Sequence, residues 1–142
     1  MPLMQLDNLV RIQKLKAEPA AEAEIEGLLR SGKARLDDAA KKSLSPESRF
    51  DLAYNAAHAL ALAALRWHGY RSDNRYLVFQ CLEHTLDLPK EQWRVLDRAH
   101  NKRNVAEYEG DVDIDLELLD ALLRVAREVY KRASTLDSIK GG

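Results

Sequence analysis

The segment RFDLAYNAAHALALAALRWHGY, residues 49–70, restricts the fold more than any other part of the chain. It follows Ser45 and Pro46, which are a favourable N-cap and a favourable first helical residue. Its apolar side chains recur at steps of three and four residues, as they do on one face of a helix. We therefore predict a long helix that ends near Gly69. It is the most apolar helix of the chain and should be central, and its many alanines allow a neighbouring helix to pack closely.

Helical patterns also occupy the rest of the chain. Gly27 and Gly32 weaken the second helix, so that it can bend or break near Ser31–Gly32. Asp113 or Asp115 can cap the last helix. No stretch alternates with a period of two over several residues, so no strand is expected. The fold class is therefore all-α, most simply an antiparallel bundle with short connections. The other predicted helices cover about residues 4–16, 19–42, 73–86, 90–110 and, after 113, up to 134.

Composition limits the classes of function. The chain has 142 residues, of which 46% are hydrophobic, enough for one globular domain over residues 1–142 with a core. Its 22 basic and 23 acidic residues leave a net charge of −1, so any binding of nucleic acid must come from a local patch. The longest apolar stretch, residues 59–65, is too short to span a bilayer, and the N-terminus has no signal-peptide pattern. The single cysteine, Cys81, excludes an internal disulfide and favours a cytoplasmic setting.

Four polar residues interrupt the apolar pattern of the central helix. Asp51, Tyr54, Asn55 and His58 are spaced by three or four residues and so share one side of that helix. Polar groups need hydrogen-bond partners if that side is buried. They form either a polar seam that sets helix register, or an exposed face, or the support of a functional site that another helix supplies.

The helix predicted at residues 90–110 can supply such a site, because its segment RAHNKRNVAEYEG is rich in polar chemistry. Arginine binds phosphate through its planar set of donors, and histidine exchanges protons near neutral pH. Together they can grip and polarise a phosphodiester without a metal. The alternative is an exposed helix with pairs such as Arg103–Glu107. Residues that follow one another along one side of this helix are Asp97, His100, Arg103 or Asn104, and Glu107 or Tyr108, while Arg98, Lys102 and Arg103 add positive charge.

Metal sites are not expected. The run EGDVDIDLE looks like a calcium loop, but the sixth and twelfth positions counted from Asp111 hold Leu116 and Leu122 instead of glycine and glutamate. Cys81 and His84 have a metal-like spacing, yet two ligands do not make a zinc site. We predict that Cys81 is a small buried apolar residue, and no cofactor is expected.

Residues 49–71, together with RNVAEY at residues 103–108, resemble the HEPN superfamily. These are small prokaryotic helical bundles that are often encoded beside a minimal nucleotidyltransferase. The resemblance covers about residues 20–135 and rests on the tyrosine and small residues of the central helix, the GYR at its end, and the later arginine–asparagine pair. The resemblance implies an up-and-down four-helix bundle with an additional short helix. The sequence pattern also predicts an N-terminal helix within residues 1–18 and a flexible tail at residues 136–142. The resemblance further implies a homodimer with the motif helices near the interface.

Many members of this superfamily are metal-independent ribonucleases, including toxins of toxin–antitoxin pairs, and others bind nucleotides or a partner protein. Their active motif is an arginine, commonly followed by a polar residue, and then a histidine that four to six intervening residues separate from the arginine. Arg103 and Asn104 match the first two positions, but Tyr108 stands where the histidine could be. Tyrosine has a reference pKa of about 10, against about 6.5 for histidine, and is a poor general base at neutral pH. His100 lies one turn upstream of the arginine.

Three hypotheses follow. The first is a binding and interaction module, in which Asp51, Tyr54, Asn55 and His58 orient a set that holds a nucleotide or RNA phosphate, or a nucleotidyltransferase-type partner. That set is Arg103, His100, Asn104 and Tyr108. The second is a metal-independent endoribonuclease, in which Arg103 stabilises the transition-state charge and His100 or Tyr108 moves the proton of the RNA 2′-hydroxyl. The third is a structural bundle without a ligand.

Overall fold

The fold is described from a computed structural model that covers the backbone of residues 4–109 and 114–141, and the side chains of residues 4–105 and 114–136. Helices account for nearly all of it, which confirms the all-α class. In chain order the elements are α1 (Met4–Arg11), β1 (Lys16–Ala17), α2 (Glu22–Ala39), α3 (Pro46–Trp67), β2 (Tyr70–Arg71), α4 (Arg75–Gln80), α5 (Leu82–Thr85), α6 (Lys90–Glu109) and α7 (Leu116–Gly141).

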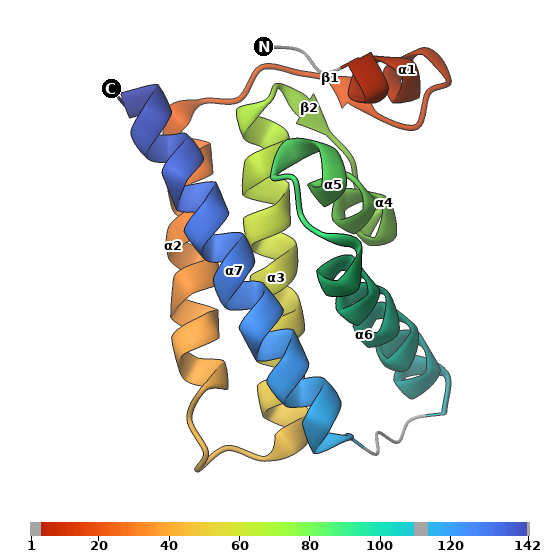
Figure 1. Cartoon of the computed structure of the whole chain (residues 1–142), viewed down its shortest axis with the longest axis vertical. Coiled ribbons are helices and arrows are strands. Elements are labelled where there is room, and N and C mark those ends of the chain that lie inside the picture. Colours follow the sequence, from red (N-terminus) through yellow and green to blue (C-terminus); the bar gives the residue numbers. More distant parts are fainter. Residues whose placement is uncertain (1–3, 110–113, 142) are drawn as a thin grey trace.

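Four long helices form an antiparallel up-and-down bundle. In the view of Figure 1, α2 runs down, α3 runs up, α6 runs down and α7 runs up again. The short helices α4 and α5 lie in the connection between α3 and α6, and α1 lies near the end of the molecule that holds β1 and β2. Helix α3 packs mainly against α2 and α7, while α6 contacts α7, α4 and α3. The bundle therefore leaves one side of α6 facing α3 and α4.

Helix α3 is the centre of the core, as its sequence predicts. The Ser48 backbone N–H donates to the Ser45 side chain at 3.2 Å, which is the expected N-cap. At the other end Gly69 has a φ of +91°, a conformation that glycine adopts without strain. Alanines of α3 are buried along its length. On the facing helix α2, Gly32 leaves room for the Leu60 side chain of α3, because a Cβ on Gly32 would lie 2.6 Å from it. Small residues thus set the separation of α2 and α3.

The interruptions of two helices differ from the sequence prediction. No break occurs at Ser31–Gly32; α2 runs unbroken because the Leu60 side chain of α3 packs over the glycine. The single helix predicted at 73–86 is instead two, α4 and α5, separated at Cys81. The apolar pattern continues through this short interruption, so the sequence contains no sign of it.

Two helix ends and the prediction of no strands are also corrected. Helix α1 ends at Arg11, and the residues after it form β1, which pairs antiparallel with β2. A pair of two-residue strands is too short to produce an alternating pattern. Helix α7 starts behind a cap at Asp115, whose side chain accepts from the Glu117 N–H at 3.0 Å, and it continues to Gly141. Asp113 lies outside the described residues, and the flexible tail at 136–142 stays a prediction.

The turn after α3 is fastened by Arg66, which is 2% exposed. Its guanidinium donates to the Glu24 carboxylate at 2.8 and 3.2 Å, and to the backbone carbonyls of Glu18, Pro19 and Tyr70 at 2.8 to 3.2 Å. One side chain therefore joins the end of α3, the β1–α2 connection and the start of α2. Nothing in the local sequence distinguishes this arginine from the exposed ones.

No helix within the described part of the chain is long and apolar enough to cross a membrane.

Candidate functional site

The polar residues of α3 and those of α6 meet in one cluster. The Tyr54 hydroxyl and His100 Nδ1 are 2.9 Å apart, and Arg103 donates a hydrogen bond to the Asp51 carboxylate. Asp51 and Tyr54 are one turn apart on α3, and His100 and Arg103 are one turn apart on α6, so the two pairs run side by side. The structure thus brings together four residues that the sequence singled out on separate helices.

Tyr54 is the buried support of this cluster. Its residue is 1% exposed, and its ring makes an edge contact with Phe79 at 5.6 Å between centroids. Arg103 Cζ lies 4.7 Å from the centroid of the same ring, within cation–π range. The ring therefore positions the Arg103 guanidinium through its face and His100 through its hydroxyl.

His100 has a partner at each ring nitrogen. Asn104 Nδ2 lies 3.2 Å from His100 Nε2, while Nδ1 faces the Tyr54 hydroxyl. The Tyr54 hydroxyl can donate to Nδ1 or accept from it, so these contacts hold the orientation of the ring, while the position of its proton depends on the tautomer. Asn104 is exposed, so an incoming group can reach Nε2 by displacing the amide.

Helix α4 contributes two residues that the sequence analysis did not select. Arg75 donates to Asn55 Oδ1 at 2.9 Å, and its Cζ lies 5.7 Å from the centroid of the Tyr54 ring. Tyr76 is hydrogen-bonded to Asp97, which raises the pKa of its hydroxyl, so the phenol keeps its proton and donates it to that carboxylate. The chain offers one local signal, the Asn74 cap that puts both residues in the first turn of α4. That α4 faces α3 and α6 is tertiary information.

Asn55 and Asp51 also serve the first turns of α3 itself. Asn55 Nδ2 donates to the Asp51 backbone carbonyl at 2.8 Å, which leaves its oxygen for Arg75. The Asp51 side chain is 60% exposed and that of Arg103 is 25% exposed. The Arg103–Asp51 pair is therefore at the protein surface, where solvent and ligands can compete for it.

His58 lies beside Phe79, with 6.1 Å between the ring centroids, and forms no hydrogen bond to α6 among the described residues. Burial, and to a smaller extent the positive charge of Arg75, lower its pKa to about 4. His58 is therefore neutral at neutral pH. His58 therefore packs at the edge of the cluster and takes no part in the polar contacts with α6.

The lowered pKa of His58 predicts acid sensitivity. The neutral ring is favoured in the fold, so its contribution to stability is complete above pH 6.5 and is lost as the pH falls toward 4. We expect the free energy of unfolding to fall by about 1 kcal/mol between pH 6.5 and pH ~5.5 through this residue alone. Urea unfolding of the native chain and of His58→Gln at both pH values checks this. An equally steep loss in the variant would contradict the assignment.

Two expectations lie outside the described residues. The side chains of Tyr108 and Glu107 are not among those described, so neither the tyrosine at the motif position nor the proposed Arg103–Glu107 pair is tested.

Cys81 is buried, and its burial raises the pKa of the thiol to about 12, which agrees with the inert apolar role predicted for it. Among the described residues no group of three or more histidine, cysteine or acidic side chains is placed to hold a metal.

Comparison of the chain with protein-family models, curated proteins and solved structures finds no match. By its fold and its polar cluster, the protein is an antiparallel helical bundle with an arginine–histidine–tyrosine cluster between α3, α4 and α6.

Proposed function

We propose that this protein is a HEPN-like binding and interaction module that holds a phosphate of RNA or of a nucleotide at the cluster around Tyr54. One observation carries the proposal: the guanidinium groups of Arg103 and Arg75 both lie against the same buried Tyr54 ring, 4.7 and 5.7 Å from its centroid. Two such groups can bind different oxygens of one phosphate. Asn104 adds an exposed amide donor beside them.

Asp51 supports this proposal as a competitor for Arg103. The Asp51 carboxylate pairs with the Arg103 guanidinium in the structure, yet this carboxylate is mostly exposed, so that breaking the ion pair and hydrating the carboxylate costs little free energy. A terminal nucleotide phosphate carries more negative charge than the carboxylate, and both it and an RNA phosphodiester fit the same planar donors. Binding would then replace one carboxylate partner by a phosphate and would weaken with salt.

The interaction part of the proposal rests on the HEPN resemblance. It makes the chain a homodimer and the partner of a nucleotidyltransferase-type protein, in a system of the toxin–antitoxin kind. Val105, directly after Asn104, is 50% exposed and offers an apolar contact beside the cluster. A partner that covers this end of α6 would also cover the phosphate site.

The second candidate function is a metal-independent ribonuclease, and the position of His100 one turn from Arg103 is the observation that favours it. In the tautomer that leaves Nε2 unprotonated, this nitrogen can accept the proton of a 2′-hydroxyl once Asn104 moves. Arg103 would stabilise the charge that develops on the phosphate.

One experiment separates these functions. A labelled oligoribonucleotide is incubated with the native chain and with Arg103→Ala in EDTA, and both binding and cleavage are followed. We expect intact RNA, and a loss of affinity of about 10- to 100-fold in Arg103→Ala, as for a hydrogen-bonded charge. Arg30→Ala, an exposed arginine of α2, is the matched control and should bind like the native chain.

Cleavage that depends on Arg103 and His100 would replace the binding proposal by the ribonuclease. Unchanged RNA binding in Arg103→Ala would reject the cluster as the phosphate site. A native chain that binds no RNA, yet loses its dimer in Arg103→Ala, would support the structural bundle.

A further inference from the structure

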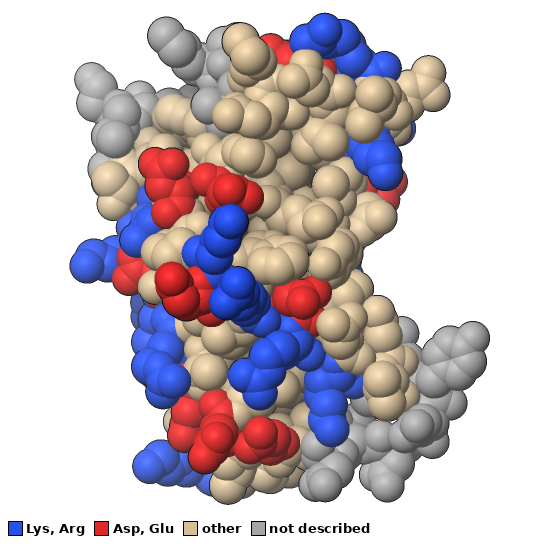
Figure 2. Space-filling model, turned by 45° about the vertical axis from the view of Figure 1, so that its right-hand side comes forward, with Lys and Arg blue, Asp and Glu red and all other residues tan. Residues whose placement is uncertain are grey.

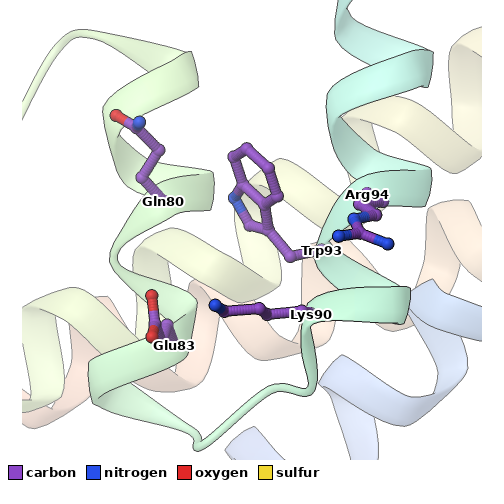
Figure 3. A pocket seen from close by; sticks show the side chains of 5 residues that line it. All are labelled: Gln80, Glu83, Lys90, Trp93 and Arg94. Atoms are coloured by element: carbon purple, nitrogen blue, oxygen red, sulfur yellow. The ribbon is translucent and has the colours of Figure 1, made fainter.

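A hollow of about 340 Å³ opens beside the cluster, at the start of α6. It lies where α4 and α5 face the first turns of α6. Figure 3 shows the Trp93 ring between Gln80 of α4 and Arg94 of α6, with the Lys90 ammonium pointing toward Glu83 of α5. An aromatic ring is thus framed by two cations, an amide and a carboxylate.

Among the described residues, the indole N–H of Trp93 lacks a hydrogen-bond acceptor in this position. The Nε1 atom is buried and forms no hydrogen bond to the described part of the chain. Buried indole N–H groups usually have an acceptor. A ligand that enters the hollow can meet both the ring and the polar groups around it.

The hollow is connected to the Tyr54 cluster by aromatic contacts. Trp93 meets Tyr76 at 6.1 Å between ring centroids, and Tyr76 meets His100 at 5.1 Å. His100 in turn is bonded to Tyr54. On α6 the residues of this side, Trp93, Asp97, His100 and Asn104, follow one another at steps of three and four. The hollow and the cluster are two parts of one surface.

Basic residues begin at that surface and turn away from it along α6, since Lys90 and Arg94 line the hollow whereas Arg98 lines a second hollow with Glu117 and Asp120 of α7. Lys90, Arg94, Arg98 and Lys102 stand at four-residue steps, each of which advances about 6 Å along the helix. Over the described part of the chain, none of the four forms an ion pair with an acidic group. On the face turned forward in Figure 2, basic side chains form a slanting band with acidic side chains above and below it. This charge arrangement fits a chain of phosphates better than a compact anion.

We propose that the hollow is a base-binding subsite for single-stranded RNA, with one base stacked on Trp93 and its phosphates held by Lys90 and Arg94. Gln80 and Glu83 offer an amide and a carboxylate to the edge of the base. The strand then continues along the side of α6 that carries Trp93, His100 and Asn104, with a further phosphate at Arg103. Stacking on an aromatic side chain combined with cations along the backbone is how sequence-tolerant single-strand sites work. The proposal rests on the proposed function, because it extends the same ligand along α6.

Trp93 fluorescence tests the subsite directly. In Trp67→Phe, Trp93 is the remaining tryptophan of the chain, and its emission reports on the hollow. We expect AMP and a short oligoadenylate to quench this emission, and inorganic phosphate and ribose 5-phosphate to leave it unchanged. Quenching by the two base-free phosphates to the same extent would overturn the base-binding role. So would the absence of quenching by the oligoadenylate.

Substitutions then separate the subsite from the Tyr54 cluster. Trp93→Leu and Arg94→Glu should each lower the affinity for the oligoadenylate by about 5- to 100-fold, whereas Arg30→Glu should not change it. Arg94 is exposed, so its variant decides the question even if Trp93→Leu does not fold. Binding that is lost in Arg103→Ala but kept in Trp93→Leu and in Arg94→Glu would overturn the subsite and leave the proposed function intact.

The opposite results are equally informative. Quenching and binding that depend on Trp93 and Arg94 but not on Arg103 would support the subsite and reject the phosphate site at Tyr54. Polyglutamate that quenches Trp93 and displaces the oligoadenylate at equal charge would overturn RNA as the ligand and indicate an acidic protein partner.

Discussion

Replacing Arg66 with alanine is expected to lower the free energy of unfolding by about 2–4 kcal/mol, mainly through the hydrogen bonds that it leaves unmade. The guanidinium is buried, and its removal leaves the backbone carbonyls of Glu18, Pro19 and Tyr70 without their donor. It also removes the partner of Glu24, whose pKa is held below its ordinary value chiefly by the hydrogen bond from Arg66. A buried acceptor at Tyr70, partly buried acceptors at Glu18 and Pro19 and a lost ion pair all destabilise the fold. Urea unfolding followed by circular dichroism measures the change.

Arg71 provides the matched control, because it shares Glu18 with Arg66 but is exposed. Its side chain is 51% accessible and lies 3.1 Å from the Glu18 carboxylate. Arg71→Ala should therefore cost less than about 1 kcal/mol. Equal losses in Arg66→Ala and Arg71→Ala would show that the buried hydrogen bonds do not hold the α3 turn to the β1–α2 connection.

The second large effect is expected in α2, from the same substitution at two glycines. Gly32→Ala would put a Cβ 2.6 Å from Leu60 Cγ and Cδ2, in a part of the core where Leu60 is fully buried. Gly27→Ala meets nothing within 4 Å. Both variants gain helix propensity of about 1 kcal/mol, so their difference isolates the clash, which should be about 1–3 kcal/mol.

Thermal unfolding of the two variants checks this pair. Gly27→Ala should be at least as stable as the native chain, and Gly32→Ala should be less stable than Gly27→Ala by the amount of the clash. Gly32→Ala with the stability of Gly27→Ala would mean that α2 and α3 are not as close as the Leu60 contact requires.

The central helix could be predicted because its limits are local. Ser45 caps its own helix three residues away, and Gly69 ends it through its own backbone conformation. The uninterrupted course of α2 could not be predicted from Ser31–Gly32, because the Leu60 side chain that packs over the glycine comes from another helix. The β1–β2 pair was missed for a related reason, since its partners are 53 to 55 positions apart, as Lys16 with Arg71.

Some residues of the candidate site could likewise be predicted from local spacing, whereas others could not. Helical spacing alone put Asp51 and Tyr54 on one side of α3, and His100 and Arg103 on one side of α6. It did not reveal that Arg75 and Tyr76 of α4 join them, or that Trp93 belongs to the same surface. Those contacts depend on how α4 and α5 fold back between α3 and α6.

The sequence by itself determined the helical class, the central helix and the polar residues of α3 and α6, because caps, glycines and three- and four-residue spacings act within one helix. Only the tertiary structure decided that Arg103 pairs with Asp51, that Tyr54 lies beneath both Arg75 and Arg103, and that Arg66 is buried. Each of these depends on the relative placement of helices. That placement is set by packing between distant side chains, which no single segment encodes.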